Sequence, residues 1–146
     1  MFLKDDEYWP FSDEYRDWNW GAISVSMSQN YRLHQFPLLW ACVGGEVRGE
    51  LLIRVDYYPA YPDWLKVTAS VKYFEGTSCG TTDLHKRTSP NPYLWVERGH
   101  NYVWNLPTLG DGEGHVGNVV LMSLTWVANS IAQKGNTFSF QIYYFF

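Results

Sequence analysis

Hydrophobic and polar residues alternate along several stretches of the chain. Between Val47 and Tyr57 the odd positions are mostly apolar and the even positions mostly polar, and residues 65–73 and 23–27 repeat the pattern. A period of two sends neighbouring side chains to opposite faces of a strand. Each of these segments is therefore predicted to be a half-buried β-strand.

Other segments complete a β-rich pattern. Residues 138–146 begin with the same alternation, whereas residues 38–43 and 119–127 are apolar at nearly every position. Apolar residues on both faces are typical of strands that are covered above and below, so the last two segments are predicted to be central strands. Residues 93–97 and 101–106 are two further candidate strands. We find no capped segment with a helical period.

Glycines mark two candidate hairpins. Gly44-Gly45 follows the apolar segment 38–43, and such a pair suits a two-residue turn in which both residues take positive φ. Arg98-Gly99-His100 separates residues 93–97 from residues 101–106 and predicts a second, looser hairpin.

Together these signals predict an all-β domain over residues 1–146, most simply an antiparallel two-layer β-sandwich of jelly-roll, immunoglobulin-like or C2-like type with about seven or eight strands. A barrel with a lumen is the alternative.

Three segments are expected to lie outside the predicted strands. They are an irregular aromatic N-terminal arm (1–20), a polar loop (75–92) and a glycine-rich connection (107–118).

The composition of the chain limits the classes of partner that we expect. The chain is 46% hydrophobic and 18% charged, which is enough apolar material for a core. The formal net charge is −4 and the basic residues are scattered, so nucleic acid is not an expected partner. No apolar run approaches the length of a membrane span, and the first residues lack a secretory signal pattern. We therefore expect a cytoplasmic protein or a processed or excised fragment.

Aromatic residues are in surplus, with 8 Trp, 11 Tyr and 8 Phe. The connection after residue 55 concentrates them beside carboxylates and prolines. Flat aromatic faces with acceptors at their rim suit a sugar ring, so we expect this stretch to bind a glycan or another small polar ligand. The predicted binding residues are Asp56, Tyr58, Tyr61, Asp63 and Trp64. The alternative is that the prolines shape a turn and the rings cover the end of the core.

A metal site is a weaker expectation. Asp111 and Glu113 offer oxygen ligands on a glycine-rich backbone, as Ca²⁺ tolerates, although a solvated turn explains the same residues. Structural zinc is disfavoured, because His100, His115 and Cys79 lack a fourth ligand and the usual spacing. No other cofactor is expected.

The two cysteines, Cys42 and Cys79, are expected to be free thiols, with a disulfide between them as the alternative. Cys79 is flanked by small residues and glycine, which is compatible with a nucleophile, but a loop thiol or a disulfide explains it better.

A non-catalytic binding domain is the preferred functional hypothesis. The alternative from another class is a structural or assembly module, in which residues 1–20 and the aromatic C-terminus pack against a partner protein or a second copy in a homo-oligomer. A hydrolase ranks third, because the sequence shows neither a carboxylate pair at a defined spacing nor a Gly-x-Ser-x-Gly nucleophile motif.

Overall fold

The structure is a computed structural model that describes residues 1–5, 12–17, 22–27, 32–100, 102–111, 114–117, 120–128 and 136–141. These residues form strands and connecting turns, with no helix among them. No described segment is therefore a helix of the length and apolarity that crossing a membrane requires. The predicted all-β class is confirmed, with antiparallel pairing throughout the described ladders.

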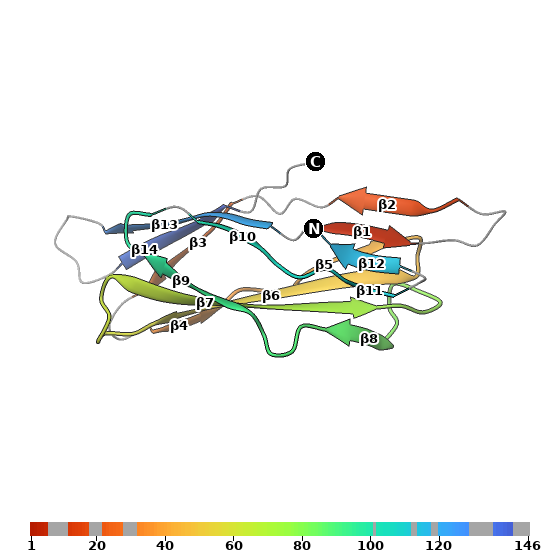
Figure 1. The fold of residues 1–146 in the computed structure, drawn as a ribbon, viewed down its shortest axis with the longest axis horizontal. Helices are drawn as coiled ribbons and strands as arrows, with labels where there is room; N and C mark the ends of the chain where they lie inside the picture. The colour runs from red at the N-terminus through yellow and green to blue at the C-terminus, as the bar shows by residue number, and fades with distance from the viewer. Residues whose placement is uncertain are drawn as a thin grey trace.

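The described strands form three sheets (Figure 1). The six-stranded sheet has the long hairpin of β6 (Val47–Tyr57) and β7 (Trp64–Phe74) at its centre, with β4 (Leu33–Gln35) and β5 (Leu39–Val43) beside β6, and β8 (Leu84–Arg87) and β9 (Tyr93–Glu97) beside β7. One four-stranded sheet has the order β11 (Leu109–Gly110), β12 (Gly114–Gly117), β1 (Phe2–Asp5), β2 (Glu14–Asp17). The other has the order β10 (Val103–Asn105), β13 (Val120–Ala128), β14 (Asn136–Gln141), β3 (Ala22–Met27).

The core covers one face of the β6–β7 hairpin. The predicted alternation is confirmed in both strands, since every second side chain is buried and the residues between them are mostly half-exposed. Met1 and Leu3 of the β1 segment and Val116 of β12 are fully buried in the same cluster. Figure 1 shows the six-stranded sheet along one side of the molecule and the two four-stranded sheets along the other. None of the described strands covers the opposite face of β6 and β7.

The turn at Gly44-Gly45 has the predicted backbone. Both glycines have positive φ, 62° and 86°, and the Glu46 N–H donates to the Val43 carbonyl at 3.2 Å. The ladder resumes with Val43 opposite Val47, so the connection contains three residues where two were predicted. Glycine is needed here because both central positions are left-handed.

The prediction of a second hairpin at Arg98-Gly99-His100 is wrong. Gly99 does form a turn with φ of 77°, but β9 pairs with β7 whereas β10 pairs with β13 of another sheet. The chain therefore crosses between sheets at this turn. Local turn chemistry cannot distinguish a hairpin from a crossover, because both begin with the same reversal of direction.

Residues 38–43 were predicted to be a central strand, and this is also wrong. Among the described strands β5 pairs only with β6, and Trp40 is 54% exposed. Only alternate residues face the core, with Ala41 and Val43 buried in it and Leu39 packed against it. The apolar residues on the other face lie on the solvent side of an edge strand.

The expected irregular segments contain strands. The N-terminal arm provides β1 and β2, and residues 107–118 provide the β11–β12 hairpin that pairs with β1. Within residues 75–92, β8 pairs with the end of β7. These strands are two to four residues long, too short for periodicity to reveal.

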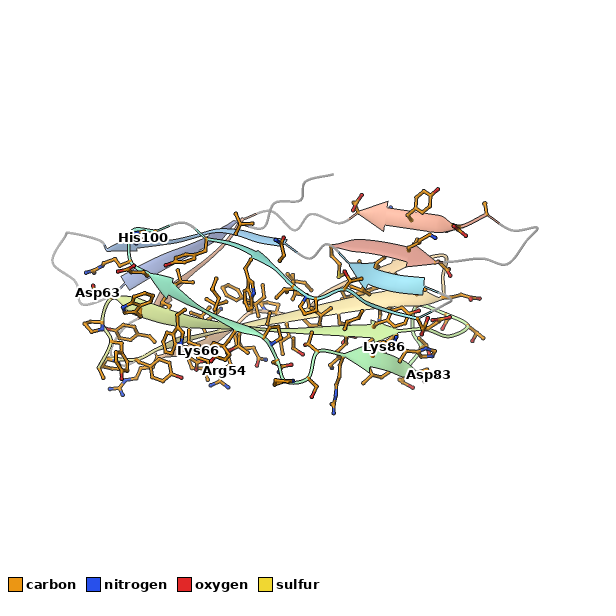
Figure 2. The ribbon with its side chains drawn as sticks, viewed as in Figure 1. Arg54, Asp63, Lys66, Asp83, Lys86 and His100 are labelled. Carbon is orange, nitrogen blue, oxygen red and sulfur yellow. A yellow bond between two sulfur atoms is a disulfide. The ribbon has the colours of Figure 1, made fainter. Side chains whose placement is uncertain are left out.

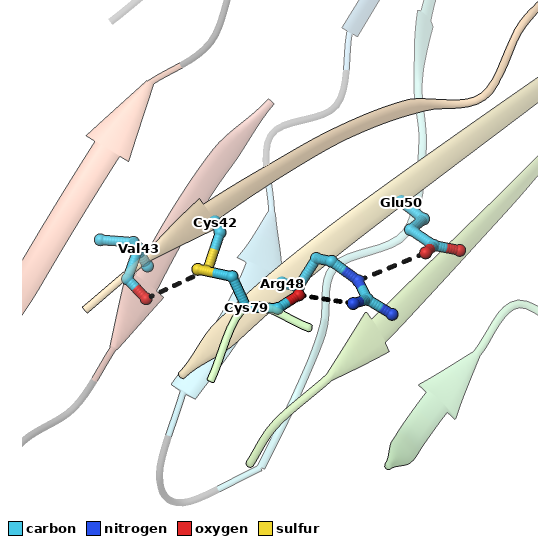
Figure 3. Close-up of a disulfide and its surroundings, with 5 residues drawn as sticks. All are labelled: Cys42, Val43, Arg48, Glu50 and Cys79. Carbon is cyan, nitrogen blue, oxygen red and sulfur yellow. Dashed lines mark hydrogen bonds and ion pairs between the residues drawn. A yellow bond between two sulfur atoms is a disulfide. The ribbon is translucent and has the colours of Figure 1, made fainter. Parts of the chain in front are cut away.

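Cys42 and Cys79 form a disulfide with their Cα atoms 5.8 Å apart (Figure 3), so the expectation of free thiols is wrong and Cys79 is not a free nucleophile. The bridge ties β5 to the loop after β7. That loop lies against Arg48, whose guanidinium donates to the Cys79 carbonyl and lies 4.3 Å from the centroid of the Phe74 ring. Strand pairing brings the two cysteines together, which their separation of 37 residues does not reveal.

Candidate functional site

Strand register arranges the solvent-facing residues of the six-stranded sheet in rows. Asp56 lies opposite Lys66, and Lys66 lies opposite Trp95. Directly opposite residues in an antiparallel pair point to the same face. A carboxylate, an ammonium group and an indole therefore line up across β6, β7 and β9.

The neighbouring row has a similar mixture of side chains. Gln35 lies opposite Arg54, Arg54 opposite Thr68, and Thr68 opposite Tyr93. This row runs across β4, β6, β7 and β9. The two rows together present aromatic rings over β9 and polar groups over β4, β6 and β7.

Two consecutive turns position the aromatic residues of the β6–β7 connection. The Tyr61 N–H donates to the Tyr58 carbonyl at 2.8 Å, and the Trp64 N–H donates to the Tyr61 carbonyl at 3.0 Å. Pro59 and Pro62 each occupy the second position of one turn, where their fixed φ is favourable. The prolines therefore shape the turns, and the same turns hold the three rings.

The rings of this connection contact Trp95 of β9. Tyr58 lies 5.6 Å from Trp95 between ring centroids at an interplanar angle of 52°, and Tyr61 lies 6.5 Å away at 65°. The four residues keep 36–60% of their surface exposed. Tyr61, Trp64 and Trp95 line an open pocket of about 340 Å³. We call Tyr58, Tyr61, Trp64 and Trp95 the aromatic cluster.

A polar groove of about 360 Å³ adjoins the aromatic cluster through Tyr58. Figure 2 shows two of its basic residues, Arg54 and Lys66, on the same side of the sheet. Its polar lining residues are Gln35, Arg54, Asp56, Lys66, Thr68, Ser70 and Asn91.

The charges in the groove are mostly satisfied within the protein. The Arg54 guanidinium donates to both carboxylate oxygens of Asp56, with contacts of 3.0 and 2.7 Å, and these bonds raise the pKa of Arg54. The Lys66 ammonium lies 4.4 Å from the centroid of the Tyr93 ring. The groove therefore offers oriented donors and acceptors without a large net charge, which suits a neutral polar ligand more than a polyanion.

Four of the five predicted binding residues lie on this face. Asp56 and Tyr58 line the groove, and Tyr61 and Trp64 line the aromatic pocket. Asp63 lines neither; its carboxylate lies 3.3 Å from the Arg98 guanidinium, beyond the end of β9.

Sequence reasoning missed Trp95, Tyr93 and Lys66. A signal for the two rings was present, since Leu94 and Val96 alternate with Tyr93 and Trp95 and so predict opposite faces. That Trp95 lies beside the β6–β7 connection follows only from the pairing of β9 with β7.

The candidate calcium site falls partly outside the described residues, because Glu113 is not among them. Asp111 is described and lies at the opposite end of the six-stranded sheet, within reach of Glu75 and His85. Figure 2 shows the neighbouring Asp83 and Lys86 at that end, far from Arg54 and Lys66. The calcium site stays a prediction.

The chain was compared with protein-family models, with curated proteins and with solved structures, and none of the three comparisons gave a match. The chemistry of this face is therefore the basis for assigning a function.

Proposed function

We propose that the solvent face of the six-stranded sheet binds a glycan or another small polar ligand without catalysis. The observation that carries this proposal is the contact between the aromatic cluster and the polar groove through Tyr58 and Trp95. A sugar has apolar C–H faces and a rim of hydroxyls, so its recognition requires rings and hydrogen-bonding groups side by side. We also propose that the three sheets form the two-layer sandwich expected from the sequence.

The exposure of the rings supports binding over a purely structural role. Each aromatic side chain in a core removes a large apolar area from water, yet Tyr61 remains 60% exposed and Trp64 36% exposed. Leaving these rings in water forgoes that stabilisation. A ligand that stacks on them would recover part of it.

The disulfide agrees with the proposal. Stable disulfides persist in oxidising compartments, where extracellular and cell-surface glycans are also found. The Cys42–Cys79 bridge therefore favours such a compartment over the cytoplasm.

The proposal is tested by titrating the protein with a panel of soluble polysaccharides and oligosaccharides while following tryptophan fluorescence. We expect at least one saturable response, and we expect the Tyr61→Ala/Trp64→Ala double variant to lose it. Trp40→Ala is the matched control, because Trp40 is an exposed ring that lines neither the polar groove nor the aromatic pocket. A flat response across the panel, or an equal loss in the control, would refute the proposal.

An assembly module remains the second candidate, supported by a different observation. All four residues of β2 are exposed, including Tyr15 at 65%, and among the described strands β2 pairs only with β1. An exposed edge strand can pair with another chain. Tyr15→Arg should then lower the mass measured by light scattering at high concentration, whereas an unchanged monomer in both proteins would exclude this edge.

A further inference from the structure

Three side chains with metal-ligating atoms converge at the end of the six-stranded sheet opposite the aromatic cluster. They come from separate elements: Glu75 follows β7, His85 lies in β8, and Asp111 follows β11. One nitrogen or oxygen of each lies within 4.8 Å of the others. Pairing of β8 with β7 and packing of β11 against both bring these distant positions together.

We propose that Glu75, His85 and Asp111 bind a divalent transition-metal ion of the zinc class. The imidazole nitrogen Nδ1 lies 3.0 Å from Asp111 Oδ2 and 3.7 Å from Glu75 Oε2. Two ligands held about 2.1 Å from a tetrahedral ion are separated by about 3.4 Å. The two observed distances lie just below and just above this value, so small side-chain adjustments would place an ion between the three residues.

The second ring nitrogen of His85 supports the same assignment. In the metal-free protein Nδ1 lies within hydrogen-bond distance of Asp111 Oδ2, and Nε2 faces the Asp83 carboxylate at 3.8 Å. A bound ion would take the place of the Nδ1 proton, and Nε2 would keep its own proton on the side of Asp83. A carboxylate behind the distal nitrogen of a histidine ligand is a recurring feature of zinc sites, because it orients the ring and raises its basicity. Asp83 would act as a positioning residue.

A buried tyrosine forms the floor of the site. Tyr73 has no exposed surface, and its hydroxyl donates to Glu75 Oε2 and lies 3.2 Å from Asp111 Oδ1. Its ring also meets the His85 imidazole edge to face, with centroids 5.8 Å apart. Burial raises the pKa of Tyr73 well above its usual range, so the hydroxyl keeps the proton that it donates. The ligands are thus held in place from below.

The site is open on its other side. The side chains of His85 and Asp111 are 32% and 29% exposed, so an ion can enter from solution. Three protein ligands leave a fourth position for water or an external ligand, as in open zinc sites. The nitrogen donor distinguishes this site from the all-oxygen sites that calcium prefers.

The test is isothermal titration of chelator-stripped protein with zinc chloride. We expect one ion per chain, at least a tenfold loss of affinity in His85→Ala and in Asp111→Asn, and about a tenfold loss in Asp83→Asn. His100→Ala is the matched control, because His100 is an exposed histidine at the other end of the molecule that also pairs with a carboxylate, Glu97. The control should bind as the parent protein does.

Circular dichroism and the thermal midpoint report whether each variant is folded. Zinc should raise the midpoint of the parent protein and leave that of His85→Ala unchanged. Substituting cobalt adds a spectroscopic readout, since a nitrogen and oxygen environment of low symmetry gives visible absorption. Absence of saturable zinc uptake by the parent protein, equal uptake by folded His85→Ala, or tighter binding of calcium than of zinc would each overturn the proposal.

Discussion

The rings of Tyr58 and Trp95 contact each other across strand β7, with centroids 5.6 Å apart. Tyr58 follows β6 and Trp95 lies in β9, which does not pair with β6. The contact spans β7 and joins the polar groove to the aromatic pocket. A ligand that covers both must therefore touch this pair.

Trp95→Ala should weaken ligand binding by about five- to tenfold, which corresponds to about 1–1.5 kcal/mol for one stacking contact. Trp95 is 37% exposed, so its removal should leave the fold intact. The measurement is the fluorescence titration with whichever saccharide binds the parent protein. Unchanged affinity in a folded Trp95→Ala protein would remove this ring from the site.

Breaking the disulfide should lower the free energy of unfolding by about 2–4 kcal/mol, because the bridge restricts the unfolded chain over a long loop. The bridged cysteines are 37 residues apart. Urea unfolding of Cys42→Ser/Cys79→Ser measures the change. The parent protein in reducing agent should unfold at the same urea concentration as the variant, whereas a parent protein insensitive to reductant would contradict the bridge.

Gly44→Ala should destabilise the protein more than Gly45→Ala. Both positions have positive φ, which costs an L-residue about 1–2 kcal/mol. At Gly44 an added Cβ would also clash with Oδ2 of the buried Asp5, whereas at Gly45 it meets nothing within 4 Å. Thermal unfolding of the two variants gives the comparison. Equal midpoints would show that Asp5 moves away without cost.

In the metal-free protein, the free energy of unfolding should depend on whether His85 is protonated. The hydrogen bond that the His85 Nδ1–H donates to the Asp111 carboxylate raises the pKa of His85 above its ordinary 6.5, partial burial opposes this, and the carboxylates of Glu75 and Asp83 raise it further. Lys86, the next residue in the chain, donates to the Gly110 carbonyl. A raised pKa stabilises the folded state fully below pH 6.5, and this stabilisation is lost as pH rises through the folded-state value.

Asp111→Asn should therefore cost about 0.5–1 kcal/mol near pH 5.5, the range for a partly exposed pair, and much less at pH 9. Urea unfolding of the parent protein and the variant, with a chelator present, measures this cost at each pH. An equal cost at the two pH values would show that charge on His85 is not the cause. His85→Gln, which has no titrating ring, should remove the difference between the two pH values.

The long central strands were predictable from the chain alone. Over Val47–Tyr57 and Trp64–Phe74 the alternation is long enough that only one register buries the apolar set, so local pattern and tertiary structure agree. Short strands such as β1 and β12 carry too few residues for a period. Their assignment depends on the strands that they pair with.

The aromatic stretch from Tyr58 to Trp64 was also visible in the sequence, because prolines and rings within a few residues of one another share one connection. The sequence did not reveal that Trp95 lies beside this stretch, or that Glu75, His85 and Asp111 come together. The sequence determined where the long strands of the central hairpin lie and which of their faces is apolar, since both depend on a period of two. Only the tertiary structure decided which strands lie side by side, because pairing joins residues far apart in the chain, and both proposed sites are products of that pairing.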